Sequence, residues 1–395
     1  MPCMTPPFWL SQGVTALAIG PDGMVLFGGG DGSVGLLSPG DGDPNRKLPV
    51  VSEVQLESTV TSIAIDDRSF DGRSYTAFVG LTNSEIYRIT ITTHDQAMYP
   101  ELILTSHDSK INDLSFPFEF SDVFATCGIG NIRIWHLATS RELLRISVPN
   151  LECKCVSFTD DGRMVVSGWT DGKIRAFGPQ TGRLLFTIHD AHHKAVTAIT
   201  STSDSRRVIS GGEDGLVRVW ELGEQTQKLL ASMKDHKGPI NCIRLRNGSD
   251  SECVSASNDG SCIIWDLTTF RRRSSLFSNT FFRGAVYHPD DSQIVTCGSD
   301  RKIAFWDTFD GEAIRIIDGS DSDQLNSVCT DRDGEVLITA GSDKLVKVWG
   351  YDMGACIAVG IGHSGSVLQA LVTPDKSKIV SVGSEGAILV WDVPS

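Results

Sequence analysis

The stretch Gly211–Trp220, GGEDGLVRVW, decides how this sequence folds, because the chain keeps repeating its pattern. An Asp-Gly turn leads into a short strand of alternating apolar residues, and the strand ends on an aromatic side chain. Strands of this kind end at Trp135, Phe177, Trp220, Trp265, Trp306, Trp349 and Trp391. Consecutive aromatics lie 41 to 45 residues apart. A period of this length, with Trp-Asp or a variant at the strand end, is typical of a WD-repeat β-propeller.

The rest of each repeat agrees with this interpretation. An apolar-alternating strand such as VTAITS (196–201) comes first, followed by a polar turn and a second strand such as RRVISG (206–211). An acidic turn then precedes the strand that carries the aromatic residue. Strands are short, turns recur every 8 to 12 residues, and long helical periodicity is absent. We therefore predict an all-β fold.

Polar residues recur at fixed distances from these aromatics. A Ser or Thr lies ten residues before most of them, an Asp or Glu lies six residues before, and a His precedes the first strand of several repeats. In WD-repeat proteins these residue types form a buried hydrogen-bonded chain that ends on the indole N–H. Two complete sets are expected to form such structural tetrads: His192, Ser210, Asp214 and Trp220, and His236, Ser255, Asp259 and Trp265.

Ser, His and Asp together also raise the possibility of a hydrolase. A single active site would not recur in successive repeats, however, and each Ser lies within a strand instead of on an exposed turn. The Gly-rich stretch 27–33 lacks the Gly-Lys-Ser/Thr ending of a phosphate-binding loop. We predict no enzymatic activity, no catalytic residue, no cofactor, no metal ion and no small-molecule substrate.

The composition limits the possible partners and the compartment. Thirty-five Lys and Arg face 49 Asp and Glu, a formal net charge of -14, which argues against nucleic acid or an anionic membrane as a partner. The N-terminus lacks a secretory pattern, and no window approaches the roughly 18 apolar residues of a membrane span. Ten cysteines without a Cys-x-x-Cys pair suggest small buried residues in a reducing, cytoplasmic compartment. Strand alternation is expected to place Cys153 and Cys155 on one face, in the core.

The aromatics also predict the domain organisation. Their number indicates a seven-bladed propeller over 101–395. The last repeat stops after its third strand, so we expect the strand 101–105 to supply the missing outer strand and close the ring. Residues 1–100 hold two weaker blade-like units, at 13–37 and 59–89. Two blades cannot close a ring alone, so they either join a nine-bladed ring or end a separate propeller, and we favour the second arrangement.

Turn residues are the candidates for partner binding. Trp169 is either an exposed anchor on one propeller face or packed against the neighbouring blade. The residues just before each turn acid should rim the same face: Thr170, Glu213, Asn258, Ser299, Ser342 and Ser384. The basic run Arg271, Arg272 and Arg273 is either a solvated outer strand or a contact with an acidic partner.

Several segments that a propeller scaffold does not require resemble the cilia- and flagella-associated protein 52 family. TSRELLRISVPN (139–150) and IRAFGPQTGRLLF (174–186) are the most specific of them, and the resemblance runs from about residue 13 to the C-terminus. It implies two seven-bladed propellers, of which this chain holds the last two blades of the first and all of the second.

The resemblance also implies a function. Members are non-enzymatic braces in motile cilia, bound inside the doublet microtubules of the axoneme to tubulin and other inner proteins. The residues by themselves indicate only a rigid protein-binding platform. An alternative is a soluble adapter, such as a ubiquitin-ligase substrate receptor or a signalling scaffold. An adapter of that kind would carry an appended recruiting motif, and no such segment is visible in this sequence.

Overall fold

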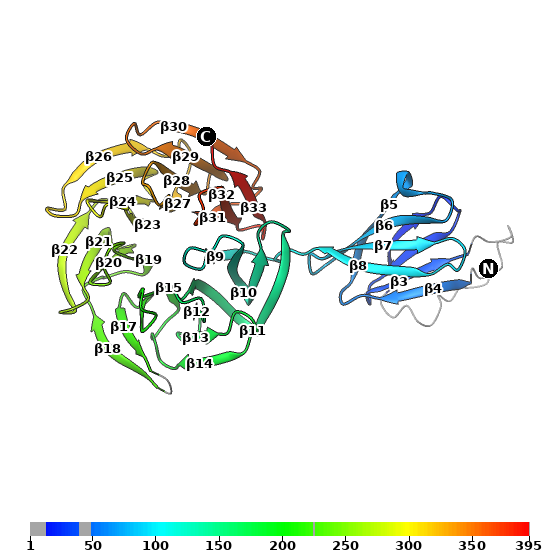
Figure 1. Ribbon diagram of the computed structural model, residues 1–395, viewed down its shortest axis with the longest axis horizontal. Coiled ribbons are helices and arrows are strands. Elements are labelled where there is room, and N and C mark those ends of the chain that lie inside the picture. Colours follow the sequence, from blue (N-terminus) through cyan, green and yellow to red (C-terminus); the bar gives the residue numbers. More distant parts are fainter. Residues whose placement is uncertain (1–12, 39–48, 224–225, 395) are drawn as a thin grey trace. The chain divides into compact units, whose positions relative to one another are not determined.

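The computed structural model describes residues 13–38, 49–223 and 226–394. The chain divides into two compact units, Met1–Asp108 and Ser109–Ser395 (Figure 1). Nearly all regular structure in both units is β-strand, as predicted, and the one helical element described is the 3₁₀ turn η1 (Asp67–Ser69). No helix in the described part of the chain is long and apolar enough to cross a membrane.

The first unit contains two four-stranded antiparallel sheets, which correspond to the two predicted blade-like units. Apolar side chains from both sheets, among them Leu26, Leu36, Tyr75 and Ile89, form one buried core. The strands of the first unit are β1 (Val14–Ile19), β2 (Val25–Gly29), β3 (Ser33–Leu37), β4 (Val50–Gln55), β5 (Val60–Asp66), β6 (Ser74–Leu81), β7 (Ile86–Thr92) and β8 (Met98–Leu104).

The structure corrects the predicted role of the strand 101–105. Residues up to Leu104 belong to β8, which pairs with β7 so that Leu104 lies opposite Ile86 and Glu101 opposite Arg88. The unit boundary accordingly lies at residue 108 instead of 100. A short turn joins β7 to β8, and a local hairpin needs far less loop-closure entropy than pairing with the distant C-terminal strand. The strand therefore completes its own sheet and does not close the ring.

The second unit is a ring of seven blades (Figure 1). Two strands of the ring, β10 and β11, are long because each of them fills two strand positions. β10 pairs first with β9 and then with β11, and β11 continues from the first blade into the second. The strands are β9 (Ile111–Ser115), β10 (Val123–His136), β11 (Arg141–Phe158), β12 (Val165–Trp169), β13 (Ile174–Phe177), β14 (Leu184–Ile188), β15 (Val196–Ser201), β16 (Arg207–Gly212), β17 (Val217–Leu222), β18 (Gln227–Met233), β19 (Ile240–Leu245), β20 (Glu252–Ser257), β21 (Ser261–Asp266), β22 (Arg271–Phe277), β23 (Phe282–Tyr287), β24 (Gln293–Gly298), β25 (Lys302–Asp307), β26 (Ala313–Asp318), β27 (Leu325–Thr330), β28 (Val336–Gly341), β29 (Leu345–Gly350), β30 (Cys356–Ile361), β31 (Val367–Val372), β32 (Lys378–Gly383) and β33 (Ile388–Asp392).

The ring closes by packing between its first and last blades. The last blade has three strands among the described residues, β31 to β33. Val380 and Val382 of this blade share a buried core with Ile111 and Leu114 of the first blade. Gln369 Nε2 also donates a hydrogen bond to Asp113 Oδ1 at 3.2 Å. Closure therefore rests on buried side chains and needs no shared strand.

A second set of contacts links neighbouring blades at the inner strands. The inner strand is the first strand of each blade. In three blades, an asparagine side-chain amide on this strand donates to a backbone carbonyl of the next blade's inner strand, 41 residues further along the chain. These hydrogen bonds are Asn112 Nδ2 to Cys153 O at 2.7 Å, Asn241 Nδ2 to Phe282 O at 2.6 Å and Asn326 Nδ2 to Val367 O at 2.8 Å. These three hydrogen bonds link the inner strands of neighbouring blades and help to fix each of those blades relative to the next.

Candidate protein-interaction face

The two predicted tetrads form in the structure. His192 lies between Asp214 and Ser210, with Nδ1 2.9 Å from Asp214 Oδ1 and Nε2 2.9 Å from Ser210 Oγ. The indole N–H of Trp220 donates to the same hydroxyl at 3.2 Å. The second set repeats this geometry: His236 Nδ1 to Asp259 Oδ2 at 3.0 Å, His236 Nε2 to Ser255 Oγ at 2.7 Å and Trp265 Nε1 to Ser255 Oγ at 2.7 Å.

A third complete set occurs in the last blade, with glutamate as its acid. His363 Nδ1 lies 2.5 Å from Glu385 Oε1, and His363 Nε2 lies 2.7 Å from Ser381 Oγ. Trp391 Nε1 donates to Ser381 Oγ at 2.8 Å. The sequence signal was present, since Glu385 lies six and Ser381 ten residues before Trp391, although this set was not among the two expected to be complete.

The burial of these hydrogen-bonded sets indicates that they stabilise the fold. Ser210 and Ser255 are fully buried, so no substrate can reach their hydroxyls, and each hydroxyl already accepts an indole N–H. Burial alone would raise the pKa of the Asp214 carboxyl. The His192 imidazole and the backbone N–H of His193 outweigh burial and lower that pKa to about 2. The geometry of a catalytic triad is therefore used here to join a turn to a strand.

Trp169, a candidate anchor from the sequence, is fully buried and cannot be an exposed contact. Its indole N–H donates to Ser167 Oγ at 2.9 Å. The strand-ending aromatic of this blade is Phe177, which has no N–H to offer, so Trp169 takes over the hydrogen bond. The Arg175 guanidinium lies 5.3 Å from the indole ring centroid and donates to Asp171 Oδ1 and Oδ2 at 3.0 and 2.7 Å. The packed interpretation of Trp169 is the correct one.

The six residues before the turn acids share one backbone contact. Each donates its N–H to a backbone carbonyl at the start of the inner strand of the same blade, which lies just before that strand in five blades and within the long strand β11 in the second blade. The pairs are Thr170 with Glu152, Glu213 with Ala195, Asn258 with Pro239, Ser299 with Phe281, Ser342 with Gln324 and Ser384 with Ser366, at 2.9 to 3.1 Å. The six residues therefore lie at the same end of their blades, and we call this end of the ring the turn face. Glu213 and Ser384 are exposed, and the other four are half-buried.

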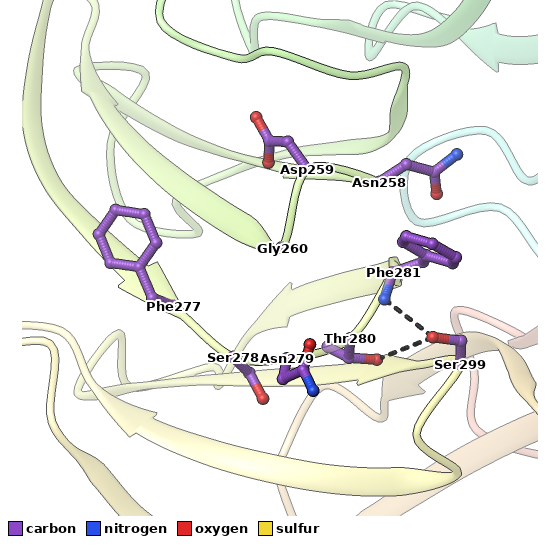
Figure 2. A pocket seen from close by; sticks show the side chains of 9 residues that line it. All are labelled: Asn258, Asp259, Gly260, Phe277, Ser278, Asn279, Thr280, Phe281 and Ser299. Carbon is purple, nitrogen blue, oxygen red and sulfur yellow. Dashed lines mark hydrogen bonds between the residues drawn. The ribbon is translucent and has the colours of Figure 1, made fainter.

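The turn face is hollowed between the fourth and fifth blades (Figure 2). The hollow has a volume of about 680 Å³ and is lined by Asn258, Asp259, Gly260, Phe277, Ser278, Asn279, Thr280, Phe281 and Ser299. Phe277 and Phe281 are 70% and 55% exposed, and the polar segment between them separates the two rings. Ser299 Oγ holds this segment by accepting the Phe281 N–H at 2.9 Å. Two exposed aromatic rings around a polar hollow suit a protein partner.

The basic run Arg271, Arg272 and Arg273 starts the outer strand β22, and all three side chains are exposed. Arg272 Nε lies 3.6 Å from Asp235 Oδ2, and Arg273 forms an ion pair with Glu252. The run lies at the opposite end of β22 from Phe277, away from the hollow. The Arg272–Asp235 pair is exposed on both sides, and exposed ion pairs of this kind add little stability.

The paired cysteines differ from the expectation. A register shift lies between Cys153 and Cys155, and the two side chains pack into different core clusters, so alternation does not place them on one face. Burial raises the pKa of both thiols, which makes them unreactive small hydrophobic residues. No cluster of three or more His, Cys, Asp or Glu side chains that could hold a metal ion lies within 13–38, 49–223 or 226–394.

Known proteins resemble nearly all of this chain. Cilia- and flagella-associated protein 52 of Chlamydomonas reinhardtii is 58% identical over 383 residues, which cover 97% of this chain and 60% of the relative. The Homo sapiens protein of the same name is 44% identical over 385 residues, 97% of this chain and 59% of the relative. The chain thus spans about 60% of the length of these relatives.

Family comparisons match the ring. The family described as WDR90, 4th beta-propeller matches residues 110–247. The family described as WD domain, G-beta repeat matches 278–307, 311–350 and 354–392. WD repeat-containing protein 90 of Mus musculus is 24% identical over 276 residues, 62% of this chain and 14% of that protein. The predicted WD-repeat propeller is confirmed.

Proposed function

The chain belongs to the cilia- and flagella-associated protein 52 family, and we propose that it is a non-enzymatic scaffold of motile cilia that binds tubulin and other inner proteins within the axonemal doublet microtubules. The likeness to those relatives over 97% of the chain carries the ciliary part of this proposal. The partners and the position inside the tubule come from the family resemblance.

The structure supports the scaffold role by its rigidity. Closed blades satisfy their own backbone groups, and the contacts at the start of the inner strands fix the turns in place. A partner that docks on such turns orders few additional groups, so little conformational entropy is lost on binding. The polar sets that resemble a catalytic site are buried in the blades. The accessible surface of the ring is therefore available for protein contacts.

The hollow on the turn face favours a second candidate, a soluble adapter that captures a peptide. A volume of about 680 Å³ flanked by Phe277 and Phe281 can accept a short apolar segment. An adapter would bind such a segment free in the cytoplasm, whereas an axonemal scaffold would bind assembled tubulin. The two functions therefore differ in the state of the partner.

Site-specific crosslinking tests the tubulin contact. A photoreactive amino acid replaces the exposed Glu213 or Ser384 on the turn face, and Phe309, 87% exposed and away from the hollow, serves as the control position. The tagged protein is expressed in ciliated cells, and isolated axonemes are irradiated. We expect tubulin adducts from at least one turn-face position in excess of Phe309. Absence of tubulin adducts from all positions contradicts the proposed partner.

A further inference from the structure

A second surface lies on the opposite side of the ring. In an antiparallel blade the first and third turns lie at one end and the second turn lies at the other. The turn face carries the second turn of each blade, so the first and third turns form the opposite face. On it, between the first and second blades, lies a groove of about 550 Å³. We call it the aromatic groove. Its lining includes Phe118, Phe120, Leu143, Leu144, Phe158 and Asp160.

The groove exposes large apolar side chains together. Phe118, Phe120 and Leu143 are 57%, 49% and 55% exposed. A single exposed apolar side chain is ordinary, but three around one groove indicate an interaction site. The loop that carries the two rings is held in place, because Arg332 stacks over the Phe118 ring at 5.2 Å from its centroid and pairs with Glu119 at 3.4 Å. The Phe118 ring therefore has a packing neighbour before any partner arrives, which lowers the entropic cost of ordering it on binding.

One edge of the groove carries two neighbouring carboxylates, of which Asp161 pairs with Arg163 at 3.9 Å while Asp160 forms no ion pair among the described residues. Asp160 lies beside Asp161, and Asp250 of another blade is close enough to interact with it. Burial first, and then the repulsion from Asp250 and Asp161, raise the pKa of Asp160 to about 6. Within the described residues no Lys, Arg or His forms an ion pair with Asp160. A cation placed here would relieve the repulsion, and groups perturbed in this way gather at binding sites.

From this arrangement we propose that the aromatic groove binds a segment of a partner protein that carries a large apolar side chain next to a lysine or arginine. The apolar side chain packs against Phe118, Phe120 and Leu143, and the cation pairs with Asp160. Charge complementarity selects this occupant, since the chain as a whole carries a formal charge of -14 and the groove adds carboxylates without a basic residue in its lining. The groove is distinct from the turn face, so the interaction goes beyond the proposed binding of tubulin.

Crosslinking on the full chain tests this proposal. A photoreactive amino acid replaces Leu143, and Phe309 again provides an exposed control position. Crosslinked segments from isolated axonemes are identified by mass spectrometry. The proposal predicts adducts at Leu143, in excess of Phe309, with segments that combine an apolar residue and a Lys or Arg. The proposal is overturned if Leu143 forms adducts only with a second copy of this chain or only with segments that lack a basic residue. It is also overturned if the adduct yield at Leu143 does not exceed that at Phe309.

Charge variants give a second measurement. Asp160→Lys is expected to reduce the Leu143 adduct at least about tenfold, as loss of one desolvated charge pair would. Glu335→Lys changes the same charge at an exposed position outside the groove and should leave the adduct unchanged. Both variants should keep the thermal midpoint of the ring, because Asp160 has no ion pair to lose. Equal adduct yields in the two variants overturn the role of Asp160. The turn-face adducts with tubulin are scored in the same samples, so failure of either proposal is seen separately.

Discussion

The indole of Trp169 donates its N–H to Ser167 Oγ at 2.9 Å, although the two residues lie only two positions apart. In six other blades the donor is the Trp that ends the third strand, and the distance to the Ser or Thr hydroxyl is 2.7 to 3.2 Å. The blade with Phe177 keeps the acceptor and supplies the donor from Trp169, the last residue of its second strand, β12. An indole N–H thus pairs with this Ser or Thr hydroxyl in all seven blades, and in one of them the indole comes from a different strand.

Removal of that donor should destabilise the ring. Trp169→Phe leaves the buried Ser167 hydroxyl without its indole partner, and we expect a loss of about 1–3 kcal/mol in the free energy of unfolding. Trp220→Phe should cost a similar amount for the same reason. Urea unfolding followed by circular dichroism measures both. An unchanged midpoint for Trp169→Phe would mean that the indole packs there without a stabilising hydrogen bond.

The buried tetrads should make the ring sensitive to acid. Burial lowers the pKa of His236 below 6.5, so below about pH 6.5 the unfolded chain binds a proton that the folded chain does not. Stability should therefore fall as the pH decreases below 6.5. The Asp214 carboxyl, with its pKa lowered from 3.8 to about 2, adds a further loss between those values.

Urea unfolding at a series of pH values tests this dependence. His236→Gln should weaken the decline below pH 6.5, and His94→Gln, at an exposed position, should leave it as in the parent protein. If both variants retain the full decline, proton uptake by His236 is not its source.

Closure by packing predicts different effects in the two units. Leu114 is 2% exposed and lies in the core shared by the first and last blades, so Leu114→Ala should destabilise the ring by about 2–5 kcal/mol. Leu102→Ala in β8, where Leu102 is 41% exposed, should leave the ring transition in place. Hydrogen exchange resolved by peptide separates the two units. Opening of β33 and β31 in Leu102→Ala would indicate that β8 does close the ring.

The two phenylalanines at the hollow on the turn face should contribute to partner binding but not to the folding stability of the ring. Phe277 and Phe281 are mostly exposed, so replacing both by Ser should change the free energy of unfolding by no more than about 1 kcal/mol. The same change should weaken retention on doublet microtubules several-fold. Phe309→Ser is the matched control and should be retained fully. Co-sedimentation of the variants with salt-washed doublets measures the effect, and equal retention of all variants would exclude the hollow as a contact.

The repeat itself was readable from the sequence because it is enforced by local chemistry. Each blade buries the same kind of hydrogen-bonded set. The sequence therefore repeats an Asp-Gly turn, an alternating strand and a terminal aromatic residue at a period near 42 residues. The residues of both predicted tetrads came together in the structure for that reason. The inner-strand hydrogen bonds of Asn112, Asn241 and Asn326 were missed, although their spacing of 41 residues to the acceptor gave a usable signal.

Other features of the fold depend on which of several possible strand pairings or side-chain contacts is the more stable, and a sequence pattern does not contain that information. The strand now assigned to β8 could pair with either neighbour, and loop-closure entropy decided for the nearer one. Trp169 looked like a turn residue, and only the missing N–H of Phe177 hinted that it points inward. The aromatic groove combines loops of two blades, so it exists only once they are packed together.

Extraction of axonemes tests the central claim most directly. The tagged protein is followed by blotting and mass spectrometry while demembranated axonemes are washed in high salt. A scaffold enclosed in the doublet microtubule should stay with the salt-stripped doublets. Release into the soluble fraction together with outer axonemal proteins, or absence from axonemes, would contradict the scaffold role and favour a soluble adapter.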